Sequence, residues 1–314
     1  MRSKIILLVI LISVAGHYTS FAQEVNDLFL QKLNGKVKSL TEVSYKVKRV
    51  HEKQEQSFYG KSSATYNLQG NKTIEYAYNP DGTLDSKSVF TYDNNGQLIQ
   101  EDSYNPDGST GFTNVYKYDK NGNMVSVNLY DAGGSLFLET LSEYDGNGNE
   151  LTETNYSQED QHDKHKDKNK DVILNKTIWR YDSKNNPLEE QYYEGDTTLT
   201  RKTAFTYDND NNKTGQDKSE GGMRIKTTYK YDQKRNPVEE TQYDASGSLV
   251  LKIVTTYDDK GNDIAENYYD KDNNLLTKST FQISYDKNNN WIRKVQSDND
   301  RIVMITTREI IYYQ

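Results

Sequence analysis

Hydrophobic and polar positions alternate with a period of two along most of this chain, in stretches of seven or so residues. Aromatic residues stand at alternate positions, as in Phe90 and Tyr92, and polar residues such as Thr91 stand between them. This alternation predicts β-strands with one aromatic face. Clusters of Asn, Asp, Gly and Pro separate the stretches and predict tight turns.

The strand pattern repeats at a fixed interval. Nine tyrosines, called the central tyrosines below, recur at a spacing close to 26 residues, with one interval of 37. A period held over most of a chain indicates a repeat protein. Positions are counted from the central tyrosine of each copy. The nine are Tyr66, Tyr92, Tyr118, Tyr144, Tyr181, Tyr207, Tyr231, Tyr257 and Tyr285.

Each repeat contains two turn motifs. The first turn has the form Asp-x-x-Gly/Asn-Asn directly after the central tyrosine, as in Asp119 to Asn123. Asp accepts hydrogen bonds from the backbone ahead of it, and Gly or Asn tolerates the left-handed conformation that closes the turn. In seven of the nine copies a second tyrosine at position +12 begins a second turn, as in Asp131 to Gly134. Each repeat is therefore strand, first turn, strand, second turn.

We expect an all-β fold, an extended antiparallel β-meander of about nine 26-residue repeats with two strands each, which could be superhelical. The sequence leaves open whether the sheet closes. A transmembrane barrel is disfavoured because the strands are short and position −1 is charged. A propeller is disfavoured because its blades need four strands and about 40 residues. The charged residues at position −1 include Lys117, Glu143, Arg180 and Lys230.

The chain divides into three parts. Residues 1–22 combine a basic start, an apolar run and small residues before a cleavage point, which predicts a signal peptide and export to the periplasm, cell surface or medium. Residues 23–51 predict a short helix capped by Asn26, which could cover the first sheet edge, and a capping strand. The repeat array covers 52–314, with a charged loop inserted at 157–171.

Composition excludes several classes of protein. The net charge of −8, without a basic stripe, disfavours nucleic acid as a partner. No cysteine is present, so there are no disulfides, no thiolate metal sites and no lipidated cysteine. Hydrophobic residues make up only 33% of the chain although it contains 26 tyrosines, which predicts a thin core rich in tyrosine. We expect no membrane span once the signal peptide is removed.

The tandem motif resembles the YD-repeat (Rhs-like) proteins. The clearest copies are residues 118–123, Tyr-Asp-Lys-Asn-Gly-Asn, and residues 257–262, Tyr-Asp-Asp-Lys-Gly-Asn. The resemblance implies an antiparallel repeat sheet on an exported protein, similar to small secreted members in Bacteroidetes-type bacteria. Large members wind such a sheet into a shell around a toxin, but this chain is several times too short for a shell and shows no toxin domain.

Site chemistry other than aromatic rings is sparse. The Asp- and Asn-rich turns resemble the start of calcium loops, but no copy has the full ligand spacing, and turn formation explains the same residues. His162 and His165 lie in the charged insert, where a solvated face is the simpler interpretation. No nucleophile elbow or phosphate loop occurs. We therefore expect no metal, no cofactor and no catalysis.

The aromatic columns are the strongest functional lead. A solvent-facing column would offer rings for stacking against sugars, whereas a buried column would form the core, and the sequence favours the core for any one column. The candidate stacking residues are the position +12 tyrosines and the two tryptophans: Tyr104, Tyr130, Tyr156, Trp179, Tyr193, Tyr243, Tyr269 and Trp291.

The sequence thus predicts a non-catalytic exported scaffold that binds a glycan or an envelope protein, because extended repeat surfaces suit binding. Two alternatives remain. One is a secreted carbohydrate-active enzyme that uses a carboxylate pair near the insert. The other is a structural component of a YD-repeat toxin-type system. The oligomeric state does not follow from the sequence.

Overall fold

The computed structural model describes residues 26–50, 53–157 and 172–314. The expected signal peptide and nearly all of the expected insert lie outside these residues. The described chain contains one short helix and twenty strands. Their bounds are α1 Asp27–Leu30, β1 Val37–Val50, β2 Lys53–Tyr66, β3 Lys72–Tyr78, β4 Leu84–Tyr92, β5 Leu98–Tyr104, β6 Thr110–Tyr118, β7 Met124–Tyr130, β8 Leu136–Tyr144, β9 Glu150–Ser157, β10 Val172–Tyr181, β11 Pro187–Glu194, β12 Thr198–Tyr207, β13 Lys213–Glu220, β14 Met223–Tyr231, β15 Pro237–Tyr243, β16 Leu249–Tyr257, β17 Asp263–Tyr269, β18 Leu275–Tyr285, β19 Trp291–Asp298 and β20 Arg301–Tyr312.

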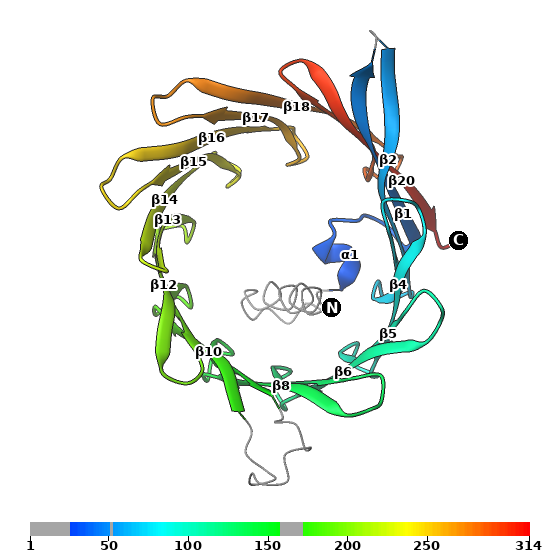
Figure 1. Cartoon of the computed structure of the whole chain (residues 1–314), viewed down its shortest axis with the longest axis vertical. Helices are drawn as coiled ribbons and strands as arrows, with labels where there is room; N and C mark the ends of the chain where they lie inside the picture. The colour runs from blue at the N-terminus through cyan, green and yellow to red at the C-terminus, as the bar shows by residue number, and fades with distance from the viewer. Residues whose placement is uncertain (1–25, 51–52, 158–171) are drawn as a thin grey trace.

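The twenty strands form one closed antiparallel β-barrel, seen as a ring in Figure 1. Each strand pairs with its neighbours in sequence, β9 pairs with β10 across the expected insert, and β1 pairs with both β2 and β20. The expectation of an open or superhelical meander is therefore wrong, although the all-β class and the repeating strand pairs are right. Closure leaves the sheet without a free edge, which removes the exposed hydrogen-bonding groups of an edge strand.

The two ends of the chain together form a tenth repeat. Tyr312 ends β20 and pairs with Val37, the first residue of β1, as Tyr92 pairs with Leu98 inside one repeat. The Tyr313 N–H donates to the Lys36 carbonyl as the Asp93 N–H donates to Gln97 in a first turn. Gly35, at φ +82°, takes the left-handed position of that turn. The seam is thus a repeat built from two distant segments.

The turns follow the chemistry predicted from the sequence. Asp119 Oδ1 accepts from the N–H groups of Asn121 and Asn123 at 2.8 and 2.9 Å. Gly122 closes this turn at φ +88°. The second turn after Tyr130 has the same form, with Asp131 Oδ1 accepting from Gly133 and Ser135 at 2.9 Å each. First turns lie at one end of the barrel, called the first-turn rim, and second turns lie at the other, because the strands are antiparallel.

The helix packs against the inner wall of the barrel. The Asn26 side chain accepts from the Phe29 N–H at 3.0 Å and caps α1, as predicted. Its expected role of covering a sheet edge is wrong, because β1 has a partner on each side. Instead α1 lies inside the ring (Figure 1), and it contributes to a buried apolar cluster. That cluster comprises Leu28, Leu33, Val37, Leu40, Ala64 and Tyr66, with Ile310 and Tyr312 packed against it.

Candidate binding site on the inner wall

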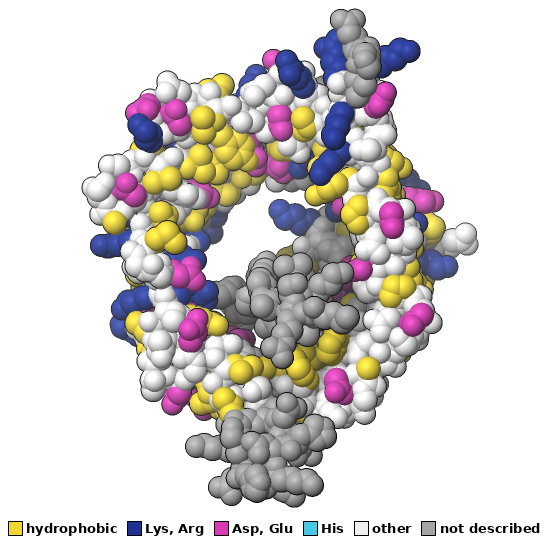
Figure 2. All heavy atoms as spheres, viewed as in Figure 1, with side chains coloured by type: hydrophobic (Ala, Val, Ile, Leu, Met, Phe, Trp, Pro, Cys, Tyr) yellow, Lys and Arg dark blue, Asp and Glu magenta, His cyan; other side chains and the backbone are white. Residues whose placement is uncertain are grey.

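The position of α1 identifies the inner face of every strand. The Tyr66 hydroxyl donates to Gln31 Oε1 at 2.7 Å, and the Tyr92 hydroxyl lies 3.1 Å from Asp27 Oδ2, so the central tyrosines point toward the helix and into the ring. Side chains alternate across a strand. Positions −2 and −4 therefore also face inward, and positions −1 and −3 face outward. Figure 2 shows charged side chains scattered over the outside of the ring.

The central tyrosines join neighbouring repeats. The Tyr118 hydroxyl donates to the Leu98 carbonyl at 2.9 Å, and the Tyr144 hydroxyl donates to Met124 at 2.8 Å. Tyr231 and Tyr257 make the equivalent bonds to Lys213 and Pro237. Burial raises the pKa of these tyrosines. This column is thus engaged in holding the wall together.

The eight predicted stacking residues do not share one surface. The six position +12 tyrosines face outward by their strand register, whereas Trp179 and Trp291 face inward. All eight are half-buried. Lysines of neighbouring strands lie over some outer rings, with Lys87 Nζ 5.3 Å from the Tyr104 centroid and Lys252 Nζ 5.6 Å from that of Tyr269. Placing all eight residues in one site was therefore an error of strand geometry, because position +12 lies on the opposite face from Trp179 at position −2 and Trp291 at position +6.

A belt of aromatic and carboxylate side chains runs along the inner wall. Position −2 of one strand pairs directly with position +9 of the next, as Phe90 pairs with Glu101, Trp179 with Glu190 and Tyr229 with Glu240. We call these two sets of residues the inner belt. Its aromatic members are Phe90, Tyr116, Trp179, Phe205 and Tyr229, and its carboxylates are Glu75, Glu101, Glu153, Glu190, Glu240 and Glu266.

The carboxylates of the belt were missed by the sequence reasoning, although a signal was present. Glutamate recurs nine residues after six of the nine central tyrosines. The aromatic residues at position −2 lie on the strand before the first turn, whereas the carboxylates at position +9 lie on the strand after it. Only the register shows that the two columns lie at the same height on one face.

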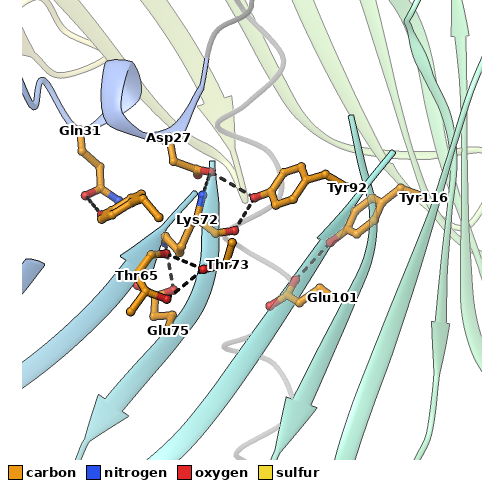
Figure 3. Close-up of polar contacts among 10 residues, drawn as sticks. Asp27, Gln31, Thr65, Lys72, Thr73, Glu75, Tyr92, Glu101 and Tyr116 are labelled. Atoms are coloured by element: carbon orange, nitrogen blue, oxygen red, sulfur yellow. Dashed lines mark hydrogen bonds and ion pairs between the residues drawn. The ribbon is translucent and has the colours of Figure 1, made fainter. Parts of the chain in front are cut away.

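Polar contacts hold the belt in place. The Tyr116 hydroxyl donates to Glu101 Oε2 at 3.1 Å (Figure 3). Asn114 Nδ2 lies 3.4 Å from the same oxygen. Burial and the Glu101 charge raise the pKa of Tyr116. Arg201 donates to Glu190 Oε1 at 2.9 Å. The carboxylates are thus fixed beside the rings while their remaining lone pairs can accept further hydrogen bonds.

Positive charge is unevenly distributed on the inner wall. The register places Lys87, Lys117, Lys176 and Arg180, the basic residues of β4 to β10, on the outside. Beyond β11 the inner wall carries bases: Lys213 Nζ lies 4.8 Å from the Tyr229 ring centroid, and the Arg308 guanidinium lies 3.5 Å from the ring of Trp291. From β4 to β10 the inner wall is therefore aromatic and acidic. Lys72 on β3, whose Nζ lies 5.5 Å from the Phe90 ring centroid, and the bases beyond β11 make the rest of the wall mixed in charge.

Two carboxyl groups of β9, Glu150 and the inner-belt residue Glu153, have altered acidity. Burial, with a smaller contribution from the charge of Glu153, raises the pKa of Glu150 to about 7. Burial also raises the pKa of Glu153. Both residues pair with inward positions of β8, Glu150 with Tyr144 and Glu153 with Ser142. An acid that is half protonated near neutral pH can donate a proton.

The Asp-rich turns use their oxygens within the turn. In addition to its two backbone contacts, Asp119 accepts from the Asn123 side chain at 2.9 Å. Hydrogen bonds to Asn123 lower the pKa of this carboxyl. Among the described residues, no three His, Asp or Glu side chains are grouped as metal ligands. The same part of the chain contains no helix long and apolar enough to span a membrane.

Comparison with known proteins adds only weak likenesses. No protein-family model matches the chain, and no curated protein matches it. A solved structure described as TcdB2-TccC3 is similar over 77% of this chain and 16% of its own length, at 12% identity and a TM-score of 0.29. A porin-like protein from Bacteroides uniformis is similar over 88% of this chain and 99% of its own, at 10% identity and a TM-score of 0.36. Similarity at this level supports no statement about family or function.

Proposed function

We propose that this protein is a non-catalytic, exported scaffold of YD-repeat type whose barrel binds a glycan along the inner belt. The observation that carries the proposal is the pairing of rings and carboxylates at one height, as in Trp179 with Glu190. Aromatic rings stack against the apolar faces of sugars, and carboxylates accept hydrogen bonds from sugar hydroxyls. This combination, repeated around a concave wall, suits a polymer of similar units better than a single small molecule.

The barrel has room for such a ligand. Twenty strands spaced about 4.8 Å apart give a circumference of about 95 Å and a diameter of about 30 Å between backbones. Barrels of about 16 to 18 strands already leave an aqueous channel. The helix α1 covers the inner wall over β1 and β2. The part of the inner belt that a ligand can reach therefore lies on the later strands, from β4 onward.

The outer wall supports a protein surrounded by water at the cell envelope. Lys117, Glu143, Arg180 and Lys230 are exposed at position −1. A basic side chain that faces lipid costs about 2–4 kcal/mol at mid-wall and about 0–1 kcal/mol near the end of a strand, where position −1 lies. The outward tyrosine column could contact a surface protein, which is the alternative partner. The location at the cell envelope rests on the signal peptide expected at residues 1–22, which stays a prediction.

The test is a glycan array probed with the protein from residue 23 onward, in three forms. Trp179→Leu removes a ring from the inner belt, and Tyr104→Leu removes one from the outer column. Near-ultraviolet circular dichroism should show that both variants keep the fold. We expect a hit that the inner variant weakens about tenfold, equivalent to about 1.4 kcal/mol, and the outer variant leaves unchanged. An array without hits contradicts glycan binding. If binding is weakened only by Tyr104→Leu, the binding site lies on the outer wall instead.

A second candidate function is glycan hydrolysis, favoured by one specific observation. Glu150, with a pKa of about 7, lies near Glu153 on the same inner wall. Glycosidases use a protonated carboxyl as general acid together with a second carboxylate. Glu150→Gln would then abolish the release of reducing ends from polysaccharide while leaving binding intact. If no polysaccharide is cleaved by the unaltered protein, the enzyme alternative fails and the binding proposal is unaffected.

A further inference from the structure

A groove lies between α1 and the first-turn rim, next to the inner belt. Its volume is about 930 Å³. Small-molecule pockets typically measure about 300–1,000 Å³. The helix contributes Asp27 and Leu30, and two successive first turns contribute most of the remaining lining, including Asn94, Gln97 and Asn121.

The walls of the groove are well fixed. Asp27 Oδ2 accepts from the Lys72 N–H at 2.6 Å and lies 3.1 Å from the Tyr92 hydroxyl, which donates to the Lys72 carbonyl at 2.7 Å (Figure 3). The turn on the other side is held by Asp93, whose Oδ1 accepts from the N–H groups of Asn95 and Gln97 at 2.8 and 2.9 Å. A fixed site loses less entropy when a ligand binds.

The lining consists mostly of uncharged polar side chains, with Asp27, Asp119 and Lys120 as its charged members, and points to a ligand that both donates and accepts hydrogen bonds. Each amide side chain, such as those of Asn94, Gln97 and Asn121, offers a donor and an acceptor. The Asp27 carboxylate is already engaged by a backbone N–H. Leu30 is 48% exposed and supplies an apolar contact. An acetamido group, with one N–H, one carbonyl and one methyl, matches these three features.

The groove is continuous with the inner belt. Tyr92 and Tyr118 line the groove, and Phe90 and Tyr116 of the belt lie two residues before them on the same inward faces. A polymer lying along the belt between β4 and β6 would therefore reach the groove at the first-turn rim.

We propose that this groove is a subsite for an acetamido sugar at one end of the glycan chain. The inference rests on the proposed function and adds the type of sugar that the site prefers. In the bound state, the amide side chains pair with the acetamido group, Leu30 contacts its methyl group, and the ring of Tyr92 lies beside the sugar face that continues toward Phe90.

Two matched pairs of variants test the groove. Asn94→Phe fills it, and Asn209→Phe makes the same change at the same position of a first turn far from α1. Both asparagines are exposed, so each change should be tolerated by the fold. On α1, Leu30→Ala removes an apolar contact of the groove, and Phe29→Ala changes a neighbour that is 64% exposed and outside the lining.

Calorimetric titrations use short N-acetylglucosamine oligomers, with glucose oligomers of matched length as the comparison. We expect the unaltered protein, Asn209→Phe and Phe29→Ala to bind the acetylated oligomers about tenfold more tightly than the glucose oligomers, a difference of about 1.4 kcal/mol. Asn94→Phe should abolish this preference and Leu30→Ala should reduce it.

The possible failures can be told apart. If the unaltered protein binds both oligomers equally, or if Asn94→Phe keeps the preference, the acetamido subsite is wrong while glycan binding on the belt stands, provided that Trp179→Leu still weakens it. If neither these oligomers nor any glycan of the array binds, the proposed function itself is wrong, and the subsite with it.

Discussion

Tyr312 pairs with Val37 across the seam between β20 and β1 in the register that joins Tyr92 to Leu98 inside a repeat. The ring is therefore closed by a repeat interface rather than by a special capping element. The hydroxyl of Tyr312 also donates to Asp286, as the hydroxyl of Tyr285 donates to Asp258 in the preceding repeat. Packing at the seam thus follows the same rules as packing elsewhere in the wall.

A circular permutant should fold if the seam is an ordinary repeat interface. A flexible linker would join Gln314 to Asn26, and the chain would be opened in the first turn between Asn209 and Asp210. Surface turns tolerate such cuts because no strand is interrupted. We expect a denaturation midpoint close to that of the parent. The control is opened inside β12, between Lys202 and Thr203, and should be much less stable. Equal loss of structure in both proteins would show that the seam differs from the other interfaces.

Removal of one central tyrosine hydroxyl should weaken the wall. Tyr118→Phe leaves the Leu98 carbonyl without its 2.9 Å partner. A hydrogen bond of this kind contributes about 1 kcal/mol to stability, and urea denaturation should show a loss of that size. Tyr104→Phe, on the outer wall, is the matched change and should alter stability by less than about 0.5 kcal/mol. A larger effect at Tyr104 would contradict the assignment of inner and outer columns.

One turn should be improved by a glycine. Arg235 has φ +66° at the position where other first turns carry Gly or Asn. A side chain in the left-handed region costs about 1–2 kcal/mol, partly offset by the flexibility that glycine adds to the unfolded chain. Arg235→Gly should therefore raise the free energy of unfolding by a few tenths to about 1 kcal/mol. Lys234→Gly, one residue earlier, should lower it. A stabilising Lys234→Gly change would indicate that another cause is at work.

Stability should depend on pH through Glu150. Its pKa is raised from an ordinary value near 4.5 to about 7 by burial. Because the folded state binds the proton more tightly, this contribution to stability is complete below about pH 4 and is lost as the pH rises through 7. The temperature or denaturant concentration at the unfolding midpoint should therefore decrease as the pH is raised from 5 to 8.

Glu150→Gln should flatten that pH dependence and stabilise the protein at pH 8. The matched variant is Glu143→Gln on the outer wall, which removes the same charge from an exposed position and should keep the slope. If the slope survives in Glu150→Gln, a different group is responsible for it.

The local structure could be predicted from the sequence because it depends on local chemistry. Asp119 and Gly122 specify a turn through their own backbone contacts, and the alternation of Phe90, Thr91 and Tyr92 specifies a strand. Closure could not be predicted in the same way. Closure depends on a small curvature that accumulates over all repeats. It also depends on a tenth repeat, which forms only when β20 from one end of the chain pairs with β1 from the other end. Tyr312 is followed by Tyr313 instead of Asp, so the repeat motif ends before the repeat does.

The candidate site was predicted only in part. Trp179 and Trp291 were among the expected stacking residues and lie on the inner wall, whereas Tyr104 and its equivalents face outward. The inner carboxylates, such as Glu101, become part of a site only when the register pairs them with rings. The groove beside α1 requires the helix to fold back into the ring, a long-range contact without a repeating signal.

The most direct test of ligand binding inside the barrel is tryptophan fluorescence during titration with a glycan identified on the array. The chain has two tryptophans, and both Trp179 and Trp291 lie on the inner wall. The Trp291→Phe variant leaves Trp179 as the single reporter in the belt. We predict a saturable change in its emission at the same ligand concentration that saturates binding measured by calorimetry. Saturable binding without any change in Trp179 emission would contradict the central claim.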